Sequence, residues 1–329
     1  MPATATRKTV AVMLLIPAVV AFALWAFAWP AARTAPRDLP IGLAGPATAT
    51  APLEQRLGAR GDAFEVHRYA DEAAARAAIE DRAVYGAIVV TPRGPRLLTA
   101  SAASPVVAGL LREAVTGQLP PGTALEVTDV VPAPAADPRG SVLAAGLLPL
   151  AMAGAASGIV TTVLGLRGAR AALALTGAAA LAGLTGAALA DSWLGAFAGS
   201  WWAEAGVLAL TMLAVGATLA GLAALIGRAG LGLGAVLMIL LGNPFSGVAG
   251  APELLPAPVG TLGRLLPPGA AGTALRSVAH FDGAGAGTAL LVLAVWAAAG
   301  LTAVLVGARR AAARATVTAA SAPVPQPAA

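Results

Sequence analysis

Membrane-length apolar runs constrain the fold of this chain more than any other feature of its sequence. A helix rises about 1.5 Å per residue, so about 20 apolar residues cross the roughly 30 Å hydrocarbon core of a bilayer. Hydrophobic residues make up 58% of the 329 and charged residues only 11%, a balance unlike that of soluble domains. We therefore expect a mainly α membrane protein with six transmembrane helices in the lipid bilayer, at residues 9–29, 142–166, 171–190, 205–227, 229–241 and 285–307, of which the fifth is short.

The charges between these runs predict the orientation of the chain. All 16 acidic residues fall in segments expected outside, whereas the connections on the other side carry only basic residues. These are Arg7, Lys8, Arg167, Arg170, Arg228, Arg309, Arg310 and Arg314. Because Lys and Arg concentrate on the cytoplasmic side, both termini are expected there. Topology, and not nucleic-acid binding, then explains the net charge of +5. The abundance of Ala, Gly and Arg indicates a bacterial genome, hence a multi-pass protein of the plasma membrane.

The first apolar run is predicted to be an uncleaved signal anchor, because its apolar core is longer than that of a signal peptide. Trp25 and Trp29 suit the outer interface. Cleavage after Ala31 and Ala32 is the alternative. Residues 1–31 are thus a cytoplasmic leader and the first helix, and residues 315–329, rich in Ala and Pro, are expected to form a disordered cytoplasmic tail.

Residues 32–140 are more polar and have the length of one ordinary soluble domain. Alternating apolar and polar residues predict strands, and periodic runs with capping residues predict helices. The expected strands are 39–44, 64–69, 85–90, 96–99 and 125–131, and the expected helices are 53–59, 71–82 and 105–116. The sequence therefore predicts a small extracytoplasmic α/β domain with a mixed sheet, inserted between the first helix and the remaining helices of residues 141–314.

Residues 242–284 form a stretch that stays apolar but contains six prolines, at positions 244, 252, 256, 258, 267 and 268. Each proline removes a backbone donor and clashes with the preceding turn, so no continuous helix passes through. Irregular backbone at membrane depth needs protein or a water-filled cavity around it. We expect a broken, partly re-entrant segment on the outer side of the bundle. A Pro/Gly-rich loop lying on the membrane surface is the alternative.

A candidate outer gate or re-entrant cap lies within this stretch. Its residues are Asn243, Pro244, Arg264, Pro267, Pro268, Arg276 and His280. Asn243 and Pro244 are expected to end the preceding helix, whose last carbonyls need an amide or a cation as partner. Pro267 and Pro268 are expected to start a short helix through Phe281, anchored by Arg276. Alternatively, Arg276 extends to lipid phosphates.

The sequence offers no catalytic, cofactor or metal constellation. Cysteine is absent, and the only lysine is Lys8, which excludes a P-loop. Ser277, His280 and Asp282 share helical spacing near the outer interface, but side chains so close on one helix rarely reach triad geometry, and interface anchoring is the ordinary explanation. No ionisable residue is expected inside the spans, which argues against ion-coupled transport. Small residues four apart, such as Gly154 and Gly158, predict close helix packing.

Several motifs resemble the ABC-2 type permease superfamily, and in particular its phage-infection-protein-like branch. They are GAIVV at 86–90 after the helix DEAAARAAIEDR, GNPFSG at 242–247, LLPPGAAGTALRSV at 265–278 and HF at 280–281. The resemblance implies a six-span subunit that dimerises with itself or a similar permease. It also implies export through a translocation path when a separate ATPase subunit hydrolyses ATP. The LRGAR connection at 166–170 is shorter than the cytoplasmic loop of such permeases.

Three function classes are therefore weighed. The first is a permease subunit of an ABC-type exporter. The second is a non-transporting receptor, scaffold or secretion accessory that presents its external domain. The third, a membrane enzyme, has no supporting residues beyond Ser277, His280 and Asp282, and we expect no enzyme activity.

Overall fold

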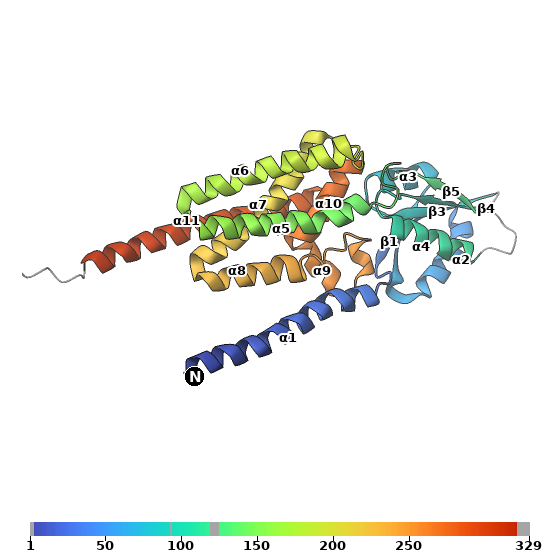
Figure 1. Cartoon of the computed structure of the whole chain (residues 1–329). Coiled ribbons are helices and arrows are strands. Elements are labelled where there is room, and N and C mark those ends of the chain that lie inside the picture. Colours follow the sequence, from blue (N-terminus) through green and yellow to red (C-terminus); the bar gives the residue numbers. More distant parts are fainter. Residues whose placement is uncertain (1–2, 93, 119–124, 321–329) are drawn as a thin grey trace, which may run out of the picture.

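Helices dominate the structure, a computed structural model that describes residues 3–92, 94–118 and 125–320. The helices are α1 (Ala3–Ala32), α2 (Ala47–Gly58), α3 (Glu72–Glu80), α4 (Pro105–Thr116), α5 (Ser141–Val163), α6 (Gly168–Ala187), α7 (Trp201–Ile226), α8 (Arg228–Ala235), α9 (Val259–Arg264), α10 (Pro267–His280) and α11 (Gly287–Ala320). The strands are β1 (Leu39–Ala44), β2 (Phe64–Tyr69), β3 (Gly86–Thr91), β4 (Gly94–Thr99) and β5 (Glu126–Asp129). Figure 1 shows a long helical bundle with the sheet at one end.

Five helices of the described chain are long and apolar enough to cross a membrane. They are Arg7–Ala32, Ser141–Val163, Gly168–Trp193, Trp201–Ile226 and Gly287–Arg314. The fifth expected span, at residues 229–241, is a shorter apolar helix, Arg228–Leu241, in which α8 continues as π-type turns at Val236–Leu241. At about 1.5 Å per residue it measures about 21 Å, less than a hydrocarbon core. The described residues thus contain five long apolar helices and one short one, which is compatible with a multi-pass membrane protein.

The bundle is built around α7, which packs against α11, α6 and α5. In the most apolar window of α7, 61% of the residues are buried, whereas in α1 the share is 6%. Figure 1 shows α1 running beside the bundle but apart from it. The start of α1 and the end of α11 lie at the bundle end remote from the sheet. Helix α11 continues to Ala320, into the predicted tail, and residues 321–329 lie outside the described residues.

Close approach of α5 and α7 depends on small residues, as predicted. A Cβ atom added to Gly158 would lie 2.6 Å from the carbonyl oxygen of Gly216, and one added to Gly154 would lie 2.9 Å from the Val215 Cβ. No real Cβ contact is that short, so only glycine permits this packing distance.

The sheet is mixed, with strand order β2-β1-β3-β4-β5. β1 pairs in parallel with β2 and β3, β3 is antiparallel to β4, and β4 is parallel to β5. Core residues place α2 and α4 on one face and α3 on the other. The predicted bounds of β1 and β2 are confirmed. The predicted start of α2 after Pro52 is wrong, because the helix begins at Ala47. Pro52 has no backbone N–H, so only the exposed carbonyl four residues earlier lacks its helical hydrogen bond, and the helix tolerates this loss.

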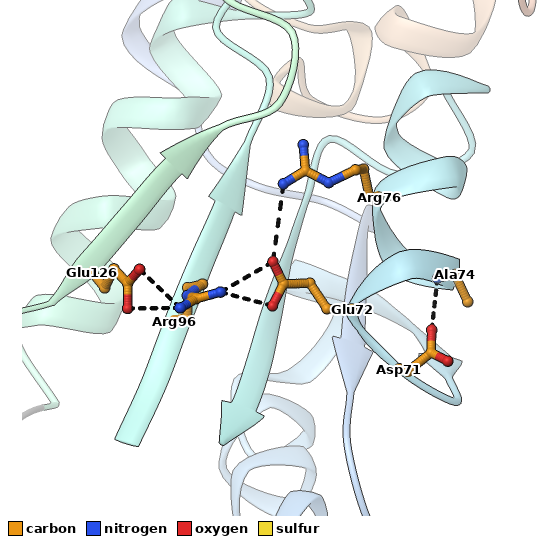
Figure 2. Close-up of polar contacts among 6 residues, drawn as sticks. All are labelled: Asp71, Glu72, Ala74, Arg76, Arg96 and Glu126. Carbon is orange, nitrogen blue, oxygen red and sulfur yellow. Dashed lines mark hydrogen bonds and ion pairs between the residues drawn. The ribbon is translucent and has the colours of Figure 1, made fainter. Parts of the chain in front are cut away.

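Capping residues and ion pairs order the sheet domain, which we define as residues 33–140. The Asp71 side chain accepts a 2.8 Å hydrogen bond from the Ala74 amide and so starts α3. Figure 2 shows Arg96 on β4 between Glu72 on α3 and Glu126 on β5, with Nη–Oε distances of 2.9 Å to each. Arg96 thereby links β4 and β5 to α3.

Residues 242–286, here called the broken stretch, are packed between the sheet domain and the bundle. The stretch contains the turn Pro252–Leu254, α9 and α10. The predicted helix start at Pro267 and Pro268 is confirmed, because both prolines occupy the first turn of α10. Helix α10 is almost entirely buried and contacts α7, α11 and α5. Protein therefore surrounds this irregular backbone, which is not spread out as a surface loop.

Candidate functional site

The sheet domain is attached to the broken stretch on both of its faces, and we call this contact region the junction. Ala251 and Leu254 pack into the core shared with α2 and α4, and Phe281 packs into the core shared with α3. The backbone amide of Arg37 also donates a 2.9 Å hydrogen bond to the carbonyl of Glu253. The sheet domain and the broken stretch therefore form one packed unit, which brings residues far apart in sequence together.

Arg82 enters the junction from the end of α3, in a backbone conformation that favours glycine. Its φ is +60°, which is uncommon for a residue with a side chain. The guanidinium Nη1 donates a 3.0 Å hydrogen bond to the Thr273 carbonyl and a short one to the Ser277 hydroxyl, both on α10. The guanidinium carbon also lies 5.2 Å from the centre of the Phe281 ring. These contacts on α10 hold the Arg82 side chain while its backbone adopts this less favourable conformation.

Glu253 is the carboxylate of the junction, and both of its oxygens are in use. The Tyr85 hydroxyl donates to Oε2 over 2.9 Å, and Arg264 Nη2 donates to Oε1 over 3.0 Å. Burial, with the negative charge of Glu253 nearby, raises the pKa of Tyr85 well above its usual value. The phenol therefore stays protonated and remains a hydrogen-bond donor to Glu253.

Arg276 on α10 is buried, with 7% of its surface exposed. Its Nη2 donates a 2.9 Å hydrogen bond to the Val248 carbonyl. Burial lowers the pKa of Arg276 to about 10, so the side chain keeps its charge at neutral pH. Arg276 therefore does not extend along the protein surface to the membrane, as the alternative expected, because its guanidinium lies inside the protein.

A cavity of about 160 Å³ lies at the centre of the junction. The ionisable groups that line it come from three segments of the chain: Arg82 and Tyr85 from the sheet domain, Glu253 and Arg264 from the middle of the broken stretch, and Arg276 from α10. Positively charged side chains from distant parts of the sequence therefore line one cavity. No sequence pattern indicates that they lie together.

His280 is the last residue of α10 and follows Arg276 by one helical turn. Burial and the charges of Arg276 and Arg82 lower the pKa of His280 to about 4, so the imidazole is neutral at pH 7. Its ring packs edge-on against Phe197. The carboxylate of Asp137 lies nearby, and hydrogen bonds from Ser141 and Val142 lower its pKa although burial alone would raise it. Asp137 thus caps the start of α5.

The predicted cap residues do not form a single cluster. Arg264 and Arg276 line the junction cavity, and His280 lies at the end of α10, whereas Asn243 and Pro244 line a separate groove. The short helix ends at Leu241, just before Asn243 and Pro244, as expected. The Leu237 and Leu241 carbonyls at this end accept hydrogen bonds from the backbone amides of Gly242 and Phe245, and not from the Asn243 side chain. Arg276 also bonds Val248, beyond that helix end.

The separate groove, here called the α1 groove, has a volume of about 440 Å³. One wall is the end of α1, the other is the broken stretch from Asn243 to Leu255, and Ala144 of α5 and Val106 of α4 complete it. Apolar side chains and small residues provide most of its lining, so it suits a hydrocarbon chain better than a polar ligand.

Several polar residues of the structure could not be found from the sequence. Tyr85 and Glu253 stand in no motif, Arg82 ends the stretch DEAAARAAIEDR without any role indicated there, and only folding brings the three together. Glu204, which lies just before an expected span, is in the first turn of α7 and is fully buried. Its Oε1 accepts a 3.1 Å hydrogen bond from the Gly199 amide. The Ser277, His280 and Asp282 set is not assembled as a catalytic triad, because the Ser277 hydroxyl is engaged by Arg82.

Comparison of the chain with protein-family models, with curated proteins and with solved structures finds no match.

Proposed function

We propose that this chain is the membrane permease subunit of an ABC-type exporter, which forms the translocation path with a second copy or a similar permease and relies on a separate ATPase subunit. The proposal rests on two features of α1. This helix packs little on its own bundle, and the α1 groove lies beside it. The motifs at 86–90, 242–247 and 265–278, which resemble ABC-2 permeases, support the same function.

The exposed surface of α1 supports assembly with a second subunit. Leu14 is 69% exposed, Leu15 63% and Ile16 58%, and other large apolar residues of α1 are exposed all around the helix. In a bilayer such a helix faces lipid or packs on another protein chain. Within one copy, α7 fills the centre of the bundle, so the described helices enclose no path of their own. We therefore place the path between two copies, with α1 and the broken stretch on its wall.

The apolar lining of the α1 groove suggests an amphipathic, lipid-like cargo. The groove lies where α1 meets the sheet domain, and Val106 of α4 borders it. A hydrocarbon chain in the groove would have its polar end near the sheet domain. The absence of ionisable residues from the middle of the described spans also favours an external energy source such as ATP over an ion gradient.

The ATPase subunit is proposed to contact the bundle end that carries both termini. That end offers the connection between α5 and α6 and the basic residues Arg309 and Arg310 of α11. The connection spans only residues 164–167, so the contact would be small. This shortness is the observation that favours the second candidate, a receptor or scaffold without transport activity.

Purification of the tagged chain from its own host membranes in mild detergent distinguishes the two functions. The proposal predicts a particle with two permease copies and a co-purified ATPase, identified by mass spectrometry and light scattering. An unrelated multi-pass protein with the same tag is the control. A monomer without ATPase, whose sheet domain instead retains another external protein, contradicts the permease function and supports the receptor or scaffold.

A further inference from the structure

The junction cavity holds more positive than negative charge. Three guanidinium groups line it, from Arg82, Arg264 and Arg276, and Glu253 is the one carboxylate among the described residues that line it. Arg264 is half exposed, with 51% of its side chain accessible, and it pairs with Glu253. The charges of Arg82 and Arg276 are therefore left without a carboxylate of their own.

The contacts of these two arginines confirm the imbalance. Arg82 donates to the Thr273 carbonyl and the Ser277 hydroxyl, and Arg276 donates to the Val248 carbonyl. All three acceptors are neutral, whereas each guanidinium carries five donors. Arg276 is buried and Arg82 is half-buried, and charges removed from water in this way are normally paired, because the cost of their desolvation is large.

Asp137, which lines an adjacent cavity together with Arg276 and His280, does not supply the missing charge. Both oxygens of Asp137 already accept hydrogen bonds at the start of α5, from the Ser141 amide and hydroxyl and from the Val142 amide, at 2.7 to 2.8 Å. His280 is neutral and adds no negative charge. The cavity volume of about 160 Å³ is several times the roughly 30 Å³ share of one water molecule, so a small anion has room.

We propose that the junction cavity binds a phosphate-class oxyanion, held by Arg82 and Arg276 with Arg264 at its rim. Planar guanidinium groups bind such oxyanions with two parallel hydrogen bonds each, which makes arginine the preferred residue for phosphate recognition. The ligand is either free phosphate or the phosphate of a lipid headgroup, because the recognising chemistry is the same.

Such an anion would connect two parts of the molecule. Arg82 belongs to the sheet domain, and Arg276 belongs to α10, which packs against α7 and α11. One ligand held by both side chains fastens the sheet domain to the bundle. This inference does not depend on transport and holds for a receptor as well as for a permease.

The test measures binding of inorganic phosphate to the full chain in a neutral detergent, by calorimetry, with chloride at equal ionic strength as reference. We expect Arg82→Gln and Arg276→Gln to weaken binding at least tenfold. Glu253→Gln removes the competing carboxylate and should tighten binding severalfold. Arg112→Gln on the exposed face of α4 is the matched control and should bind as the parent does.

Two probes distinguish the sources of the phosphate. If the site serves free phosphate, inorganic phosphate binds with this arginine dependence and short-chain phosphatidylglycerol does not. If it serves a lipid headgroup, short-chain phosphatidylglycerol binds with this dependence and inorganic phosphate is weak. The proposal is overturned if neither probe binds above the chloride reference, or if Glu253→Gln and Arg264→Gln, which spare Arg82 and Arg276, leave the affinity for both probes unchanged.

Discussion

At the residue scale, Arg82 shows how one side chain can outweigh a local conformational preference. The end of α3 requires a positive φ, which glycine adopts without cost and other residues adopt at about 1 kcal/mol or more. The guanidinium repays this cost through its hydrogen bonds to α10. Substitutions at position 82 can measure the energetic effect of the backbone conformation separately from that of the side-chain contacts.

We predict that Arg82→Gly is more stable than Arg82→Ala by about 1 kcal/mol, because both lose the guanidinium but only glycine relieves the backbone. Thermal unfolding of the detergent-solubilised chain, followed by tryptophan fluorescence, measures the difference. Equal stability of the two variants would show that the positive φ carries no cost at this position.

His280 gives a pH dependence whose sign follows from its surroundings. Its folded-state pKa is about 4, below the value of about 6.5 in an unfolded chain. Between these values the unfolded chain binds more protons, so stability is complete above about pH 6.5 and falls as the pH drops toward 4. We predict that the unfolding temperature of His280→Gln changes less with pH between 4.5 and 6.5 than that of the parent.

The same measurement on His67→Gln is the control, since the chain contains only these two histidines. The control variant should keep the slope of the parent. A slope that persists in His280→Gln would assign the pH dependence to another group and contradict the burial of His280 beside Arg276.

At the element scale, the packing of α5 on α7 depends on single glycines. We predict that Gly158→Ala lowers the unfolding temperature, because the added Cβ would lie 2.6 Å from the Gly216 carbonyl oxygen. Gly146→Ala in the same helix is the matched control, since its Cβ meets nothing within 4 Å. Alanine also has the higher helix propensity, so the control should be neutral or stabilising. Destabilisation of both variants to the same extent would contradict the packing.

Elements were predictable where the cause is local. The strands at 39–44 and 64–69 follow from alternation, and the starts of α4 and α10 follow from prolines in their first turns. The junction was not predictable, because Arg82 and Thr273 are 191 positions apart. No local pattern encodes which helix end meets which strand when every segment is rich in Ala and Gly. Arg264 and Arg276 were selected as isolated charges in an apolar stretch, but their partners required the fold.

At the scale of the whole molecule, the two ends of the bundle differ in chemistry. The sheet domain lies at one end, and both termini lie at the other (Figure 1). We predict that Ala59→Cys on the sheet domain reacts with an impermeant thiol reagent in intact cells, whereas Ala312→Cys reacts only after lysis. Both positions are exposed, and the parent chain has no cysteine, so it is the unreactive control. The reverse labelling would contradict the proposed topology.

The central claim is that cargo passes along the α1 groove of a permease driven by ATP. Ala144 lines this groove, whereas the adjacent Ala145 is exposed on α5 and lies outside the groove lining. Tryptophan at position 144 should fill the groove, and tryptophan at 145 should project away from it.

The most direct measurement uses the purified complex with its ATPase in liposomes that contain a fluorescent short-chain phospholipid. Dithionite quenching reports ATP-dependent movement of this lipid between leaflets. We predict that Ala144→Trp reduces the rate at least tenfold, while Ala145→Trp keeps the rate of the parent. Equal rates in all three proteins, or no dependence on ATP in the parent, would contradict the account.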